Sequence, residues 1–305
     1  MANRFGSDAQ VRRARAERET HGMTATLGPC ISADSHVTEP PGTYIDRIDP
    51  KYRDRAPRLH HHDMLGDVML IDNGKSLVPF WLVAAAGRPT EEVRLDIDKR
   101  FDDLWRGGWD PVARLLDQDL DGVVAEVIYP SVGMLLCNHP DAEYQRACFN
   151  AYNLWIAEFC ATAPERLIGL GQTALVTPED GIRDLEAIKK LGLKGVMLPG
   201  IPPQKDYDDP MYDELWDAII DLGLPPSFHI LTSRSDTPGA DHVRVCGGGV
   251  GDLFRERDTP VQVAVGVRSS RPTAWVHRPD AVAGQTVCFI LRRFFPWRNL
   301  GRSRS

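Results

Sequence analysis

The sequence has no apolar run approaching the roughly 18 residues that a membrane-spanning helix needs. Its first 27 residues contain five arginines but no apolar segment, so they are not a secretory signal. We interpret residues 1–27 as a disordered or frayed arm, and Met23 is an alternative start. The 305 residues carry a net charge of −7 at pH 7, which argues against nucleic acid or an anionic membrane as the main partner.

Cysteines are few and irregularly spaced, and no two of them form a Cys-x-x-Cys pair. In a chain of this length without a signal, they are expected to be reduced, mostly packed thiols of a cytoplasmic protein. The six cysteines are Cys30, Cys137, Cys148, Cys160, Cys246 and Cys288.

The stretch of residues 31–41 has the strongest chemical pattern. It predicts a short strand in which Asp34 and His36 share one face, because strand side chains alternate between faces. A carboxylate and an imidazole side by side at a strand end form half of a divalent metal site, and Glu39 is a candidate third ligand or base. The structural alternative is that Asp34 caps a turn and His36 lies on the surface.

Residues 40–60, rich in Pro, Asp and Arg, predict a long surface loop. The histidines at 60–62 are expected to be a solvated part of this loop, since three adjacent side chains cannot share one face. Residues 67–84 alternate around Asn73-Gly74, a strong signal for a two-residue hairpin turn. The pattern therefore predicts a hairpin inserted at about 60–85.

From Trp109 onward, expected helices and strands alternate. Helices are expected after Asp110-Pro111, over 140–162, from Thr177 through Leu191 and over 210–222; strands are expected over 123–128, 167–175, 195–198 and 227–231. The helix over 140–162 should bury Tyr144, Cys148, Ala151, Tyr152, Trp155 and Phe159.

This alternation predicts consecutive βαβ units and a parallel sheet, as either a (β/α)8 barrel or a doubly wound open sheet. No Gly-rich phosphate loop follows any expected strand, which removes the usual mark of a dinucleotide-binding open sheet. Reactive side chains instead follow the strands: Asp34, His36, Tyr129 and His229. Barrels place their active sites at these strand ends, so we favour the barrel.

The sequence also resembles the amidohydrolase-related branch of the amidohydrolase superfamily, which includes aminocarboxymuconate-semialdehyde, γ-resorcylate and 5-carboxyvanillate decarboxylases. The resemblance spans about 29–238. It rests on the ordered set of residues 32–40, Arg53-Asp54-Arg55-Ala56-Pro57, Ala151-Tyr152-Asn153 with Trp155, Pro164-Glu165-Arg166-Leu167, residues 191–196 and residues 225–229.

This resemblance implies a divalent ion, Zn or Mn, at the mouth of the barrel, with Asp34, His36 and His229 as ligands. Asp-Ser-His stands where many relatives have His-x-His, and it resembles the Glu-x-His of some decarboxylases. The implied activity is non-oxidative decarboxylation or hydrolysis of a small carboxylated, for example aromatic, substrate. Tyr129 is a candidate substrate contact, with packing as the favoured alternative. Relatives often dimerise, so a homodimer is one expected assembly.

The resemblance stops near residue 238. Residues 241–305 contain eleven arginines, no lysine and five acidic residues, a net charge of +6 that leaves −13 on residues 1–240. We interpret 28–238 as a partial barrel, truncated after about its fifth strand, and 239–305 as an Arg-rich tail, frame-shifted or spliced on. His242, His277 and Asp280 lack the strand-end context of replacement ligands.

The expected sixth-strand histidine and the later aspartate of the family are not recognisable in the tail, so the catalytic acid or base is unassigned. The alternative function is therefore an inactive remnant with an incomplete metal site. An open half-barrel leaves sheet edges uncovered, so the chain is also expected to be poorly stable. A third hypothesis, an interaction module that uses the basic tail, has little support.

Overall fold

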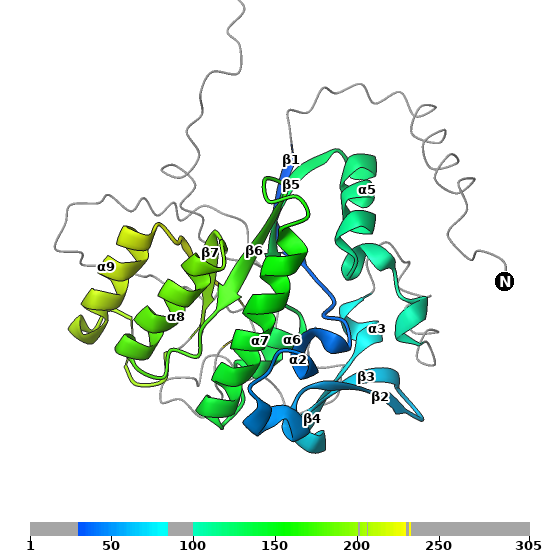
Figure 1. Ribbon diagram of the computed structural model, residues 1–305, viewed down its shortest axis with the longest axis horizontal. Helices are drawn as coiled ribbons and strands as arrows, with labels where there is room; N and C mark the ends of the chain where they lie inside the picture. Colours follow the sequence, from blue (N-terminus) through cyan, green and yellow to red (C-terminus); the bar gives the residue numbers. More distant parts are fainter. Residues whose placement is uncertain (1–29, 85–99, 201, 206, 230–231, 233–305) are drawn as a thin grey trace, which may run out of the picture.

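The computed structural model describes residues 30–84, 100–200, 202–205, 207–229 and 232. Its main sheet is parallel and has five strands: β1 (Cys30–His36), β5 (Val123–Tyr129), β6 (Leu167–Gln172), β7 (Gly195–Leu198) and β8 (Pro226–Phe228). The sheet curls as half of a barrel, with helices on its outer side (Figure 1). Among the described residues, the four longer helices are α5 (Pro111–Asp121), α7 (Ala142–Cys160), α8 (Pro178–Lys190) and α9 (Asp213–Leu222).

Strand order decides between the two architectures that the sequence left open. The order across the sheet is β1-β5-β6-β7-β8, which follows the order along the chain without a reversal. A doubly wound sheet reverses its order at a switch point, whereas a barrel adds each strand beside the last. The fold is therefore a (β/α)8-type barrel of which the described residues form the first five strands, as the sequence predicts.

The expected helix starts are present. Asp110 accepts hydrogen bonds from the backbone N–H groups of Val112 and Ala113, and Thr177 accepts one from Asp180. Both are followed by proline at the first helical position, where its missing N–H costs nothing. Gly122 ends α5 with φ of 71° and Gly192 follows α8 with φ of 82°, a left-handed conformation that glycine adopts without strain.

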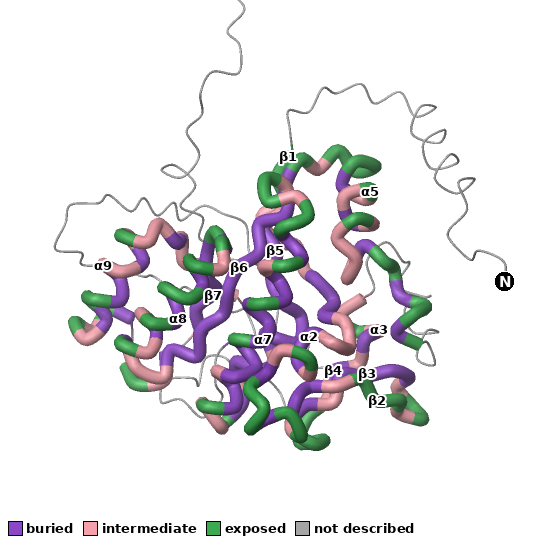
Figure 2. Tube along the Cα trace, viewed as in Figure 1, coloured by how far each residue is buried: buried purple, intermediate pink, exposed green. Residues whose placement is uncertain are grey.

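The core lies between the sheet and α7. Strands β6 and β7 run through the molecule as buried segments (Figure 2), and each is buried along its whole length. All six residues expected on the inner face of α7 are buried: Tyr144, Cys148, Ala151, Tyr152, Trp155 and Phe159. The prediction for this helix is confirmed.

The inserted hairpin is present but larger than expected. A second sheet pairs β2 (Arg58–His62), β3 (Gly66–Ile71) and β4 (Ser76–Pro79) in antiparallel order, at the lower right of Figure 1. Ile71 pairs with Ser76, so residues 72–75 form the turn rather than Asn73-Gly74 alone. The turn includes the short 3-10 helix η2 (Asp72–Gly74), with Asp72 and Asn73 both at positive φ.

The prediction of a surface loop over residues 40–60 is wrong in part. It contains α2 (Gly42–Ile45) and η1 (Pro50–Arg55), and the histidines at 60–62 belong to strand β2. Proline at the first position of η1, with Asp49 as cap, starts a helical turn there instead of preventing one. The other short elements are α3 (Phe80–Val83), η3 (Phe101–Asp103), η4 (Arg106–Gly108), α6 (Val132–Leu136) and η5 (Pro210–Tyr212).

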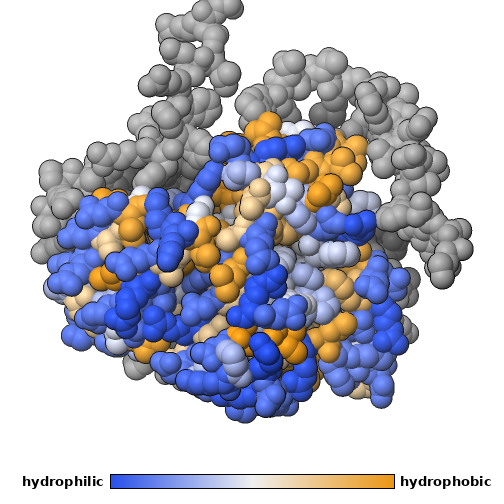
Figure 3. All heavy atoms as spheres, in the orientation of Figure 1, coloured by the Kyte–Doolittle hydropathy of each residue, from blue (hydrophilic) through white to orange (hydrophobic). Residues whose placement is uncertain are grey.

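Helix α5 turns its apolar side outward. Val112 and Leu116 are 59% and 61% exposed, and Leu120 is also exposed, whereas Arg114 and Gln118 are buried. These three residues, spaced four apart, form an apolar stripe visible over α5 at the upper right of Figure 3. In a closed barrel each outer helix has neighbours on both sides. Among the described residues, α5 lies at the β1 end of the sheet, where the next helix of a closed barrel would pack.

The predicted thiols are free where the structure describes them: Cys30 is exposed, and Cys137, Cys148 and Cys160 are buried. Burial raises the pKa of each of these three buried thiols to about 12. None of the described helices is long and apolar enough to cross a membrane. The arm of residues 1–27 and the tail of residues 239–305, with Cys246 and Cys288, lie outside the described residues.

Candidate metal centre

The structure brings the three expected ligands together, although 193 residues separate the two histidines. Asp34 and His36 come from the end of β1, and His229 follows β8 at the other edge of the described sheet. His36 Nε2 and His229 Nε2 are 3.2 Å apart. Asp34 Oδ1 lies 3.4 Å from each of these nitrogens. The curvature of the sheet therefore assembles the group, since a flat sheet would hold its two edge strands far apart.

A local irregularity in β1 accompanies this arrangement. Ser32 pairs with Glu126 and Ser35 with Ile128, so the register shifts between them, and Asp34 lies inside the shifted segment. Bulges of this kind re-aim side chains next to functional sites. Simple alternation placed Asp34 and His36 on one face, but it contained no signal for the irregularity.

The tautomer of His36 is fixed by its surroundings. His36 Nδ1 lies 2.9 Å from the carbonyl oxygen of Pro130. A carbonyl only accepts hydrogen bonds, so Nδ1 carries the proton and Nε2 presents its lone pair to Asp34 and His229. Burial lowers the pKa of His36, with smaller effects from Pro130, His229 and Asp34. A neutral imidazole with a hydrogen-bonded Nδ1 is the form that ligates metals.

The three atoms fit a small divalent cation. Ligands about 2.0–2.1 Å from a tetrahedral ion are separated by about 3.3 Å, close to the spacings of 3.2–3.4 Å found here. Asp34 Oδ1 is buried and has no hydrogen-bond partner, although buried carboxylate oxygens nearly always have one. A cation would satisfy this atom. Within the described residues, no other group of three His, Cys, Asp or Glu side chains has such spacing.

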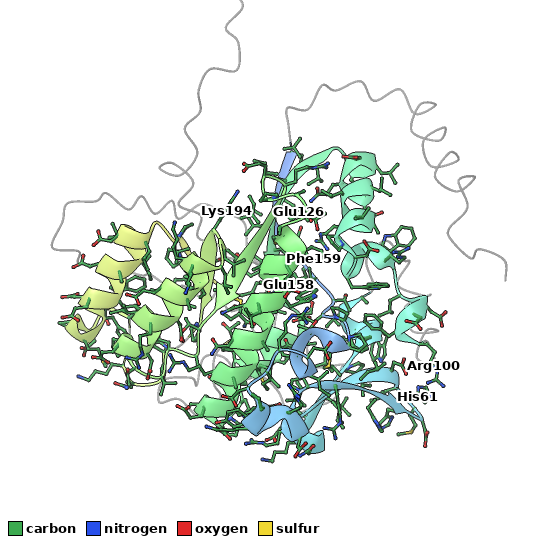
Figure 4. All side chains as sticks on the ribbon, viewed as in Figure 1. His61, Arg100, Glu126, Glu158, Phe159 and Lys194 are labelled. Atoms are coloured by element: carbon green, nitrogen blue, oxygen red, sulfur yellow. The ribbon has the colours of Figure 1, made fainter. Side chains whose placement is uncertain are left out.

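Arg114 of α5 supports the same strand end, and sequence reasoning missed it. Its Nη1 donates to the backbone oxygens of His36 and Gly107, at 3.0 and 3.1 Å, and its Nε donates to Glu126 at 2.5 Å. Figure 4 labels Glu126 on β5, beside α5. The sequence contains no signal for this role, because the apolar stripe Val112, Leu116 and Leu120 predicts that the opposite side of the helix, with Arg114, faces solvent.

Glu39 lies fully buried, with both carboxylate oxygens engaged by backbone N–H groups. Ser131, Val132 and Gly133 donate to it at 3.0–3.2 Å, and Tyr44 Oη donates at 3.3 Å. Burial raises the pKa of Glu39 and these backbone bonds oppose that effect. Its contacts therefore connect β1 to the turn after β5, and the roles of third ligand or base suggested from the sequence gain no support.

Tyr129, the candidate substrate contact, is fully buried at the end of β5. Its hydroxyl is hydrogen-bonded to Ser227 Oγ, and its ring lies 5.0 Å from the His229 ring and 5.7 Å from the His36 ring. Burial raises the pKa of Tyr129 to about 12, so its phenol stays protonated at neutral pH. These contacts are those of a residue that packs under the two histidines, and substrate contact stays a prediction.

Comparison with known proteins shows what this chain is similar to. Residues 139–285 match the family model described as amidohydrolase, and this match extends beyond residue 238, where the resemblance seen in the sequence ends. No curated protein matches the sequence. An amidohydrolase from Mycobacterium avium subsp. paratuberculosis superimposes with a TM-score of 0.54 at 20% identity, covering 68% of this chain and 60% of that one.

Two decarboxylases superimpose less closely. 5-Carboxyvanillate decarboxylase from Novosphingobium aromaticivorans gives a TM-score of 0.43 at 20% identity, covering 68% of this chain and 52% of that one. 2,6-Dihydroxybenzoate decarboxylase from Rhizobium gives 0.39 at 17% identity, covering 67% and 50%. The chain thus spans between half and three fifths of the length of these structures. The resemblance drawn from the sequence is confirmed by the match of residues 139–285 to the amidohydrolase family model, and the fold of the described residues is similar to that of the Mycobacterium amidohydrolase.

Proposed function

We propose that the chain is a metal-dependent enzyme of the amidohydrolase-related type, acting on a small carboxylated substrate, with Asp34, His36 and His229 as metal ligands. The observation that carries this proposal is the set of three ligand atoms within 3.4 Å of one another, from opposite edges of the described sheet. When bound there, a Zn or Mn ion would polarise a carboxylate or carbonyl oxygen, or lower the pKa of water to about 7.

Two reactions fit this centre. In decarboxylation, the bond between the substrate carbon and its carboxylate breaks, CO₂ leaves, and the carbon takes up a proton. In hydrolysis, water adds to an ester, lactone or amide and the leaving group is protonated. The likeness of Asp34-Ser35-His36 to the Glu-x-His of decarboxylases favours the first reaction.

Metal content of the purified full-length protein tests the site. Elemental analysis of the wild-type chain is expected to give close to one Zn or Mn per chain. The double variant His36→Ala with His229→Ala is expected to lose it. His61→Ala is the matched control, because His61 is half-exposed on β2 and pairs with Asp67 at 2.8 Å. Arg100 also contacts Asp67, and Figure 4 labels His61 and Arg100 near each other beside the inserted hairpin.

The competing function is a remnant that has lost turnover. Absence of metal from the wild-type chain, after supply of Zn²⁺ and Mn²⁺ during expression, would contradict the metal centre and favour the remnant. If metal is bound, CO₂ release from γ-resorcylate-type acids and hydrolysis of lactones distinguish the two reactions. A metal-loaded chain inactive in both assays would support a remnant that keeps its metal site.

A further inference from the structure

We propose that Glu39 is a positioning residue for the metal centre: it fixes the single peptide group whose carbonyl orients His36. This inference rests on the proposed function, because it concerns the same three ligands. It assigns Glu39 neither to the metal nor to the substrate. Its role is to set the position and the donor strength of the His36 imidazole.

The link passes through one rigid unit. The carbonyl of Pro130 and the N–H of Ser131 belong to the same peptide group, which is planar and, like every described peptide bond here, not cis. His36 Nδ1 donates to that carbonyl at 2.9 Å. The N–H on the opposite side donates to both oxygens of Glu39, at 3.1 and 3.2 Å. Rotation of this plane would therefore break contacts with Glu39 and His36 together.

The following two residues hold the same turn. Val132 N–H donates to Glu39 Oε2 and Gly133 N–H donates to Oε1, each at 3.0 Å. Three consecutive N–H groups thus converge on one carboxylate. Because Glu39 is fully buried, no water competes for these bonds. The turn after β5 is therefore held in place by Glu39, which follows the end of β1 by only three residues.

The same contacts also influence the electronic state of His36. An N–H that donates to a carboxylate polarises its peptide group, and hydrogen bonds in such a chain strengthen one another. The Pro130 carbonyl becomes a stronger acceptor for Nδ1–H, which makes Nε2 a better electron donor. Outer partners of metal-bound histidines commonly act in this way.

The test separates positioning from simple support of the fold. The variant Glu39→Gln keeps the size of the side chain but directs an NH₂ group at backbone N–H donors. The first measurement is the tautomer of His36 in metal-free protein, from ¹⁵N chemical shifts assigned by comparison with His36→Ala. Wild type is expected to show the Nδ1–H form, and Glu39→Gln a mixture of both tautomers.

The second measurement is Zn²⁺ affinity by competition with a chelator. We expect Glu39→Gln to bind Zn²⁺ roughly 10- to 100-fold more weakly than wild type. Asp184→Asn is the matched control. It also removes a buried carboxylate, one held by Arg146 and Thr173, so it should destabilise the fold while leaving the His36 tautomer and Zn²⁺ affinity unchanged.

Glu39→Asp replaces Glu39→Gln if the latter does not fold; its shorter carboxylate keeps the charge but does not reach all three N–H groups, and an intermediate effect is expected. A folded variant with the wild-type tautomer and affinity would overturn the proposal, as would failure of both variants to fold. A wild-type chain that binds no Zn²⁺, but whose His36 tautomer still depends on Glu39, would instead refute the proposed function alone.

Discussion

Arg114 connects three elements through one guanidinium group, and its position explains why a charged residue is buried at the end of α5 nearest the site. It donates to Glu126 on β5 and to backbone oxygens of β1 and of the segment before α5. Arg114 and Glu126 are nearly buried, with 10% and 13% of their side chains exposed. Removing one member of a buried ion pair costs much stability, because the other charge stays buried without a partner.

We therefore predict that Arg114→Met lowers the free energy of unfolding by about 3–5 kcal/mol, measured by urea denaturation at pH 7. The matched control is Lys205→Met, which removes an ion pair with Asp209 in which the lysine is exposed. That change should cost less than about 1 kcal/mol. Equal losses in the two variants would contradict the role given to Arg114.

The lowered pKa of Asp72 predicts that the stability of the protein depends on pH in the acid range. The Arg55 guanidinium, 2.6 Å away, holds the pKa of this carboxyl far below its usual range, with Lys75 adding to the effect. The unfolded chain therefore binds more protons than the folded one as the pH falls through the ordinary Asp pKa of about 3.9. Stability from this residue is present above that pH and is lost on acidification.

In Asp72→Asn, the slope of stability against pH between pH 5 and 3 should be shallower by up to about 1.4 kcal/mol per pH unit. Asp184 gives the opposite sign, because burial raises its pKa despite bonds from Thr173 and Arg146. Its contribution is present below the unfolded pKa and is lost as the pH rises, so Asp184→Asn should steepen the same slope. Urea denaturation of wild type, Asp72→Asn and Asp184→Asn at several pH values in this range measures the three slopes. Parallel curves of stability against pH would refute the roles given to Asp72 and Asp184.

Single residues also show how far the site was predictable. Asp34 and His36 could be proposed from the alternation of side chains along a strand, and His229 from the family resemblance, with all three following parallel strands whose ends meet in a barrel. Arg114 and the contacts of Glu39 could not, because they depend on how α5 rotates about its axis and on the turn after β5. The structure places the three proposed ligands together, and whether they bind metal stays a prediction.

At the scale of elements, predictions succeeded where a local signal fixed the boundary. Helix α8 is an example: Thr177 caps it, Pro178 begins it and Gly192 follows its end. The prediction of a loop over residues 40–60 failed because it treated proline only as a residue that ends helices. At Pro50, beside a capping aspartate, it instead begins η1.

The cap of α8 supports a direct test. Thr177 Oγ1 accepts from the Asp180 backbone N–H at 3.1 Å and bonds to the Asp180 carboxylate at 3.2 Å. Thr177→Ala should lower the free energy of unfolding by about 1 kcal/mol, because Asp180 N–H loses its partner. Thr177→Ser keeps the hydroxyl and should lie close to wild type in the same urea titration. A loss of equal size in Thr177→Ser would assign the effect to the lost methyl group.

At the scale of the whole molecule, the barrel was predictable from the alternation of strands and helices, since each βαβ unit adds the next strand beside the last. The orientation of α5 was not, because its apolar stripe alone predicts burial. Val112, Leu116 and Leu120 are exposed since the described residues provide no helix on that side of α5. Within the described residues, the exposure of this stripe reflects the absence of a neighbouring helix and is not a property of α5 itself.

The two edges of the described sheet lead to a prediction about self-association. Among the described residues, β1 pairs only with β5 and β8 only with β7, so each has an edge without a partner strand. Ile31 on β1 is 47% exposed, close to the exposure of the α5 stripe. Exposed edges and apolar patches of this kind favour association between copies. Sedimentation velocity of the full chain should therefore show an average mass that rises with concentration, together with a broad, low thermal transition.

Positive charge on β1 and on the α5 stripe should reduce this self-association. The double variant Ile31→Lys with Leu116→Lys is expected to shift the sedimentation profile toward the monomer, because lysine on an edge strand opposes pairing with another chain. Met64→Lys is the control, since Met64 is 73% exposed at the turn between β2 and β3, away from the main sheet. A wild-type chain that sediments as a monomer at every concentration and melts sharply at high temperature would contradict the open barrel, because its edges would then have to be covered within the chain itself.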